Sequence, residues 1–259
     1  MYSFLHGLLA DRKGGEIFTL FSLTHFLYIA LAIAAAVALL KIFVKRGREA
    51  KERCERVLIT SAFIAYVLDF FLMPLAYGEI DIEKLPFHAC TASCVLCFLS
   101  YYIGALSKYR TSFAMLGFIS NLVYLIYPAG VMWHAVHPIS YRVIQTLLFH
   151  AVMSVYALLV LVWNRKRIEL KYCYRELILT SVMTLWALLG NYAYNGKSDD
   201  YDHFFNWFFV VRDPFYIIPE SISPFVMPFI NLAVFFAVEV LVHLMIKALK
   251  KKKCENDSL

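Results

Sequence analysis

Two side chains in apolar segments of this chain, Cys90 and His150, are of the types that nucleophilic catalysis requires. The thiolate is the nucleophilic form of cysteine, and histidine is suited to accept its proton near neutral pH. Pro86 precedes Cys90 in the stretch LPFHAC and fits the first turn of a helix, so Cys90 is expected within the first two turns. Unpaired N–H groups and the helix dipole stabilise a thiolate there. The pair therefore predicts a cysteine nucleophile with a histidine base.

Other polar side chains in apolar segments are expected at a similar depth and form the predicted supporting pocket. Asp69 would fix the tautomer of His150, and Asn191 would donate a hydrogen bond to an oxyanion or a lipid headgroup. By depth alone, Cys94 matches His150 better than Cys90 does. The complete set of predicted supporting residues is Asp69, His88, Cys94, Asn121, Asn191 and Asn231.

A stripe of thiols is the most unusual feature of the segment that contains Cys90. Cys90, Cys94, Cys97 and Tyr101 share one face of a helix, while His88 is expected to point to the opposite side. The stripe also has a plain structural interpretation, because cysteine packs between helices as a small hydrophobe. The C-x-x-C spacing inside it is a weak redox signal, and ligands spread over ~10 Å of one helix do not converge on a zinc ion. No cofactor and no metal are predicted.

The composition places these residues in a membrane. Of the 259 residues, 61% are hydrophobic and 17% are charged, and the mean hydropathy is +0.64. Soluble domains contain about 25% charged residues. Disordered chains lack aromatic residues such as the 22 Phe and 17 Tyr found here. The net charge of +6 comes from basic residues clustered between apolar runs, which indicates cytoplasmic loops rather than a nucleic-acid surface.

Seven segments are long and apolar enough to cross a hydrocarbon core of about 30 Å as helices of about 20 residues. We therefore predict an all-α, polytopic membrane bundle that forms a single domain over residues 1–259. The predicted transmembrane helices cover residues 21–44, 57–77, 87–107, 112–133, 141–163, 176–195 and 222–249.

Lys and Arg are concentrated in alternate connections, which sets the predicted orientation. The connections after the first, third and fifth spans and the C-terminal tail are basic, whereas residues 78–85 contain only Lys84. The N-terminus is therefore predicted outside and the C-terminus in the cytoplasm, with the candidate site in the outer half. Glu239 and His243 lie near the cytoplasmic end, where a paired or snorkelling role is expected. Short loops suit a bacterial plasma membrane.

One long connection, residues 196–221, is predicted to lie outside. Its aromatic run is too short to cross a membrane and too apolar to lie free in water. We favour an aromatic belt at the outer interface over a lid on a substrate entrance. The run consists of Phe204, Phe205, Trp207, Phe208 and Phe209.

The stretch LPFHAC resembles the Leu-Pro-x-His-x-Cys signature of the YwaF family of bacterial integral membrane proteins, which also includes animal transmembrane protein 164. His150, the segment 190–192 (Gly-Asn-Tyr) and Gly196 extend the resemblance from about the second predicted span to the seventh. The resemblance implies seven helices. Its animal branch implies a cysteine-dependent acyltransferase that remodels phospholipids, with Cys90 and His150 at the essential positions. Ala151 stands where glycine is expected, and the Pro-rich end of the last outer loop matches poorly, which bears on substrate choice more than on fold.

These residues allow three classes of function. The first is a lipid acyltransferase or thioesterase, in which Cys90 takes an acyl group from a phospholipid and a lysophospholipid or water receives it. The second is a non-catalytic transporter or receptor that binds a small polar solute. The third, a thiol redox or metal protein, is the least favoured. The expected partner is membrane lipid and not nucleic acid. The residues that would bind a solute in the second class are Asp69, His150, Asn191 and Asn231.

Overall fold

The computed structural model describes residues 9–10, 15–78, 82–132, 135–195 and 205–256, and these residues form helices and connections without a β-strand. The prediction of an all-α fold is confirmed. Gly196 and Phe204, two of the residues considered above, lie outside the described residues. The long helices are α2 (Leu23–Phe43), α3 (Arg48–Tyr77), α6 (Arg110–Ile126), α8 (Tyr141–Trp163), α9 (Cys173–Asn195) and α10 (Ser223–Asn256). The shorter elements are η1 (Ile82–Lys84), α4 (Ala89–Leu99), α5 (Gly104–Ser107), α7 (Ala129–Met132), η2 (Arg165–Arg167), η3 (Leu170–Tyr172) and η5 (Trp207–Phe209).

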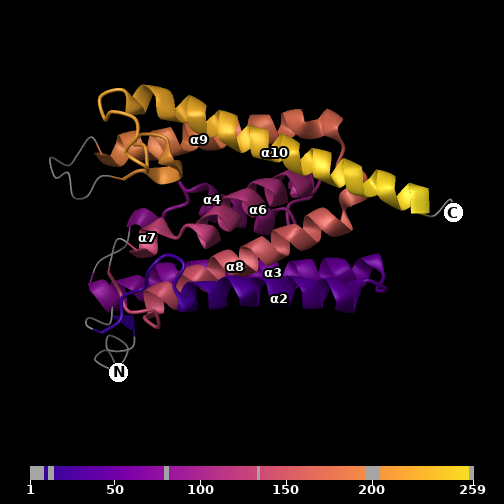
Figure 1. The fold of residues 1–259 in the computed structure, drawn as a ribbon, viewed down its shortest axis with the longest axis horizontal. Helices are drawn as coiled ribbons and strands as arrows, with labels where there is room; N and C mark the ends of the chain where they lie inside the picture. The colour runs from indigo at the N-terminus through magenta and orange to yellow at the C-terminus, as the bar shows by residue number, and fades with distance from the viewer. Residues whose placement is uncertain (1–8, 11–14, 79–81, 133–134, 196–204, 257–259) are drawn as a thin grey trace.

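The helices pack in three layers, with α4 and α6 in the middle layer (Figure 1). On one side, α8 contacts α2, α3 and α6. On the other side, α9 and α10 pair with each other, and both contact α6. The short helix α4 is enclosed between α3 and α6. This arrangement brings the beginning of α4 and the beginning of α8 to the same end of the bundle.

Five helices of the described chain are long and apolar enough to cross a membrane. They correspond to the first, fourth, fifth, sixth and seventh predicted spans, and α8 begins and ends at the predicted residues. By length and composition the chain is therefore an integral membrane protein. The second predicted span lies within α3, which begins earlier, at Arg48. The five candidate spans are Leu23–Phe43 (α2), Arg110–Met132 (α6 with α7), Tyr141–Trp163 (α8), Leu170–Asn195 (η3 with α9) and Ser223–Ala248 (within α10).

Two predicted helices are divided by turns. The prediction of one continuous helix over residues 87–107 is wrong, because α4 has only 11 residues and ends before Ser100, whose carbonyl accepts a hydrogen bond from Arg110 (3.3 Å). A helix of this length rises about 16 Å, roughly half of a hydrocarbon core. The fourth predicted helix is also interrupted, because α6 ends at Ile126 and Pro128 disfavours helical geometry in the residue before it.

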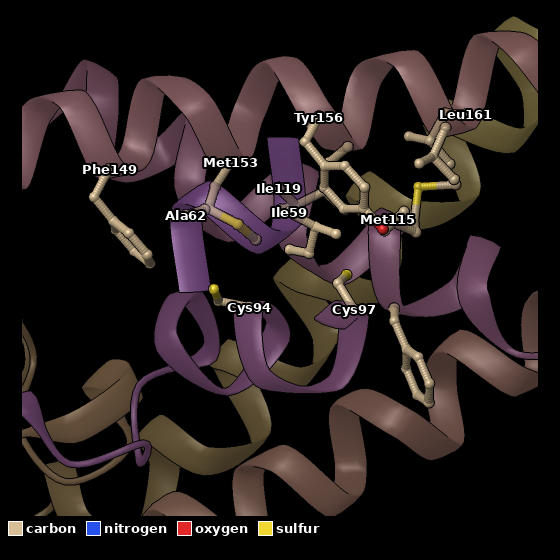
Figure 2. Packing of buried hydrophobic residues seen from close by; sticks show 14 of the residues in the cluster. Ile59, Ala62, Cys94, Cys97, Met115, Ile119, Phe149, Met153, Tyr156 and Leu161 are labelled. Atoms are coloured by element: carbon tan, nitrogen blue, oxygen red, sulfur yellow. The ribbon is translucent and has the colours of Figure 1, made fainter. Parts of the chain in front are cut away.

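The thiol stripe contributes to the core rather than to an open surface. Cys94 and Cys97 project from α4 toward α3, α6 and α8, and both are fully buried (Figure 2). Their packing confirms the structural interpretation of these two thiols as small hydrophobes between helices. Their labelled neighbours in the cluster are Ile59, Ala62, Met115, Ile119, Phe149, Met153, Tyr156 and Leu161.

Candidate active site

A cavity of about 210 Å³ is lined by residues from the beginning of α4 and of α8. Cys90 and His150 both line it, and so do two predicted supporting residues, Asp69 and His88. Much of the wall is aromatic or aliphatic. The remaining polar and charged side chains of the lining, apart from tyrosines, are Glu83, Lys84, Thr91, Ser120, Arg142, Gln145, Thr146 and Asn206.

Cys90 is the second residue of α4, so the prediction that it lies in the first two turns is confirmed. Pro86 is not part of the helix, because α4 begins at Ala89 after His88 as the N-cap. The Pro86 carbonyl instead accepts a hydrogen bond from the indole N–H of Trp186 (2.8 Å). Cys90 is a free, half-buried thiol that faces the cavity from the positive end of the α4 dipole.

His150 lies two turns into α8 and presents one unpaired ring nitrogen. Its Nδ1 lies 3.0 Å from the carbonyl oxygen of Thr146, which can only accept, so Nδ1 carries the proton of the neutral ring. Nε2 then holds a lone pair, and it is buried without a hydrogen-bond partner among the described residues. The ring lies against Tyr124, with the two centroids 3.9 Å apart. His150 is therefore held in the tautomer that a base requires.

Asp69 lines the cavity but has other partners than His150. Its Oδ2 lies 2.7 Å from Nζ of Lys84, and its Oδ1 accepts a hydrogen bond from the Tyr141 hydroxyl (3.0 Å). The predicted role of Asp69 as the group that orients His150 is therefore wrong, because the Thr146 carbonyl does this. Asp69 is fully buried, and its charge is balanced by Lys84 at the cavity wall.

His88 lines the same cavity as Cys90, although it was expected on the opposite side. The expectation assumed helical geometry, whereas His88 is the N-cap of α4 and has extended backbone angles (φ −77°, ψ 143°). Its side chain makes no capping hydrogen bond to the helix. Instead, Nδ1 of His88 accepts a hydrogen bond from the backbone N–H of Phe208 (3.2 Å).

Four predicted supporting residues lie outside the cavity lining, namely Cys94, Asn121, Asn191 and Asn231. Cys94 is fully buried in the core between α3, α6 and α8. Asn121 is also fully buried, and its amide donates to the Gly117 carbonyl one turn earlier on α6 (2.8 Å). Cys94 was predicted near His150 from its depth along the helix axis. Its side chain, however, points into the core and not into the cavity. Cys90 is the cysteine that shares the cavity with the histidine.

Asn191 and Asn231 bind the backbone of the aromatic segment, which is the described part of the predicted aromatic run, residues 205–209. The amide of Asn191 donates to the Trp207 carbonyl (3.0 Å), and its oxygen accepts from the Trp207 N–H (2.9 Å). The amide of Asn231 donates to the Phe208 carbonyl. The predicted role of Asn191 as an oxyanion or headgroup donor is therefore wrong, because Asn191 binds the Trp207 backbone and is not among the residues that line the cavity. Gly190, next to it, leaves room for the ring of Phe87, which lies 2.5 Å from where a Cβ would stand.

The aromatic segment packs into the bundle and forms one wall of the cavity. Trp207 and Phe208 are 1% and 3% exposed, and both line the cavity with Phe205 and Phe209. The prediction of an aromatic belt is therefore wrong for Trp207 and Phe208, because the side chains face protein. Phe208 and Phe209 have positive φ angles of 59° and 52°, which are costly for residues with a side chain. The segment keeps this backbone because its neighbours bind it on several sides.

Sequence reasoning missed several residues of the cavity, of which Tyr124 and Thr146 hold the ring of His150. A periodic signal for one of these residues was present in α8. On α8, Arg142, Thr146 and His150 recur every four residues and all line the cavity. A polar stripe at this spacing marks one face of an otherwise apolar helix.

A second buried polar cluster lies at the opposite end of the bundle, near the beginning of α9. Glu176 accepts a hydrogen bond from Ser112 (2.7 Å) and lies 3.4 Å from Nε2 of His243. Glu239 accepts from Thr180 (2.8 Å). Glu239 and His243 are 0% and 3% exposed, so the snorkelling interpretation is wrong, and α9 provides their partners. The hollow beside Glu176 and His243 has a volume of only about 20 Å³.

A protein-family model matches most of the chain. The family model described as the TMEM164 family matches residues 20–249, which include every residue of the cavity lining. The chain belongs to the TMEM164 family. No curated protein and no solved structure matches it. Within this TMEM164-family chain, the described residues contain no group of three or more His, Cys, Asp or Glu side chains that could hold a metal ion.

Proposed function

We propose that this TMEM164-family protein is a membrane-embedded, cysteine-dependent acyltransferase or thioesterase that acts on the acyl chains of phospholipids. The observation that carries the proposal is a single cavity lined by the Cys90 thiol and by His150, whose Nε2 holds an unpaired lone pair. A thiol in a largely apolar cavity does not ionise spontaneously, so it needs a neighbouring base in the correct tautomer. His150 meets this requirement.

The reaction would proceed in two half-reactions. Nε2 of His150 accepts the Cys90 proton while the sulfur bonds to the ester carbonyl carbon of a phospholipid. The carbon–oxygen ester bond then breaks, and the departing lysophospholipid oxygen takes the proton from His150. A lysophospholipid or water attacks the resulting thioester, with His150 again as the base, and the Cys90 thiol is restored. The apolar part of the cavity wall suits the acyl chain.

The membrane setting that we propose has seven crossings, with the N-terminus outside and the C-terminus in the cytoplasm of a bacterial plasma membrane. The second crossing would be the apolar part of α3, and α4 with the turn after it would make the third. A short α4 is compatible with this setting because it is surrounded by protein rather than by lipid. The cavity would then lie in the outer half, within reach of phospholipids.

The direct test is covalent labelling of the purified protein in vesicles of phospholipid with alkyne-tagged acyl chains. We expect a label that hydroxylamine removes, that is absent in Cys90→Ala and that persists in Cys94→Ala. Cys94 is a matched control, because it lies one helical turn away in the core. Absence of label in the wild type, or label that survives Cys90→Ala, would contradict the proposal.

Transport of a small polar solute is the alternative that one observation favours, namely the Asp69–Lys84 ion pair at the cavity wall. Uptake into proteoliposomes separates the two functions. Uptake that persists in Cys90→Ser and is lost in Asp69→Asn would support transport. Acyl transfer predicts the reverse sensitivity, with thioester formation lost in Cys90→Ser.

A further inference from the structure

We propose that His88 is a third catalytic residue, whose Nε2–H donates a hydrogen bond to the oxyanion that forms on the acyl carbonyl. This inference rests on the proposed acyl-transfer function and adds a donor to its nucleophile and base. His88, Cys90 and His150 all line the same cavity.

The tautomer of His88 follows from its partner. The backbone N–H of Phe208 can only donate, and it lies 3.2 Å from Nδ1 of His88, so Nδ1 holds the lone pair. The proton of the neutral ring is then on Nε2. The same reasoning gives the opposite tautomer for His150, because a carbonyl at Nδ1 can only accept. The cavity therefore contains two imidazoles with complementary roles, one as an acceptor and one as a donor.

Hydrogen bonds fix the backbone around Phe208, so that the Phe208 N–H stays in position to bind Nδ1 of His88. Phe208 has a φ of 59°, and its carbonyl accepts a hydrogen bond from Asn231 while its N–H donates to His88. The preceding residue, Trp207, is bound on both sides of its backbone by Asn191. Such strain persists only where the surroundings determine it, and it is concentrated at functional sites. Asn231 and Asn191 are thus positioning residues for His88.

The His88 ring has no structural role in the helix that follows it. An N-cap side chain usually accepts a hydrogen bond from the first turn, but His88 makes none. Its carbonyl accepts instead from the Thr91 hydroxyl (3.1 Å). A histidine in this position therefore serves either to anchor Phe208 or to act in the cavity, and the two roles can be separated.

In the reaction, His88 stays neutral and transfers no proton. As the Cys90 sulfur bonds to the carbonyl carbon, the carbonyl electron pair moves to oxygen, and His88 Nε2–H stabilises the negative charge. The pair returns when the ester carbon–oxygen bond breaks, and the departing oxygen takes the proton held by His150. Removal of one oxyanion donor typically slows acyl transfer ~10²–10³-fold.

Two substitutions distinguish a donor from an anchor. His88→Asn keeps an acceptor near Nδ1 for the Phe208 N–H but does not reach the Nε2 position. His88→Gln places an amide donor near Nε2 but loses the acceptor at Nδ1. We expect the initial rate of thioester formation from alkyne-tagged phospholipid vesicles to fall ~10²–10³-fold in His88→Asn and to recover in part in His88→Gln. A mere anchor would give the reverse order, and that order would overturn the proposal.

Alkylation of Cys90 by iodoacetamide is the second readout, because this displacement forms no oxyanion. We expect an unchanged alkylation rate in both His88 variants, which also shows that the site is folded. Alkylation slowed as much as acylation would overturn the proposal. If the wild type forms no thioester on Cys90, the acyl-transfer function itself fails. If it does and His88→Asn acylates at the wild-type rate, only the role of His88 fails.

Discussion

The two buried polar clusters of this protein contain similar side chains but differ in the space around them. At one end of the bundle, His150 shares a cavity of about 210 Å³ with Cys90, and one of its nitrogens has no partner among the described residues. At the other end, His243 lies beside Glu176 and a hollow of about 20 Å³. A volume of this size holds little more than a water molecule. Buried polarity alone therefore does not identify a site, and room for a ligand does.

Substitution of the two histidines is the largest expected contrast. His150→Ala removes the base, so alkylation of Cys90 by iodoacetamide and acylation by phospholipid should both slow by about 10²–10⁴-fold. His243→Ala is the matched control and should leave both rates of folded protein unchanged. Rates are measured by mass spectrometry of the Cys90 peptide. Equal rates in the two variants would remove the distinction between the clusters.

The second contrast concerns the free energy of unfolding. A substitution of Glu176 should lower it more than a substitution at the cavity. Glu176→Ala removes the acceptor of the buried Ser112 hydroxyl and the carboxylate beside His243, so we expect a loss of about 1.5–3 kcal/mol in the free energy of unfolding. Thermal or denaturant unfolding in detergent measures it. The acylation rate per folded molecule should stay at the wild-type value. A slower rate at full folding would connect this cluster to the chemistry.

The asparagine that binds the cavity wall should affect both stability and activity. Asn191→Ala removes two hydrogen bonds to the Trp207 backbone, which we expect to cost about 1–3 kcal/mol of stability. It should also lower acyl transfer, because the wall that positions His88 loosens. Asn121→Ala is the control, since Asn121 is equally buried but binds the Gly117 carbonyl of its own helix rather than the cavity wall. Unaltered transfer in Asn191→Ala would show that the wall is not needed.

The last expected effect is steric and concerns stability alone. Gly190→Ala places a Cβ 2.5 Å from the Phe87 ring, so overpacking should cost about 1–3 kcal/mol, measured by unfolding in detergent. Gly104→Ala is the control, because nothing lies within 4 Å of its Cβ position. Similar stabilities for the two variants would show that Phe87 can move aside without cost.

Much of the fold could be predicted because continuous apolar runs determine long membrane helices. The bounds of α8 followed from the run between Tyr141 and Trp163. The end of α4 could not be predicted, because it depends on tertiary contacts, such as the hydrogen bond from Arg110 to the Ser100 carbonyl. A run of apolar residues does not show where a chain turns inside a protein core.

The candidate site was predictable in its reactive residues but not in its supporting contacts. The types of Cys90 and His150 marked them, and the structure places both at one cavity. The orientation of His88 was missed because it depends on where α4 begins, at Ala89. The partner of Asn191 was missed because it is a backbone group in a separate segment, at Trp207. Sequence patterns report side-chain chemistry, whereas hydrogen bonds to loop backbone require coordinates.

The most direct measurement is tandem mass spectrometry of the protein quenched with acid during its reaction with phospholipid vesicles, before the thioester is resolved, comparing wild type with His150→Ala. The account predicts an acyl thioester on Cys90 in the wild type and a strongly reduced amount in the variant at the same time point. A thioester on another cysteine, or equal amounts on Cys90 in both proteins, would contradict the claim that one cavity joins this thiol to its base.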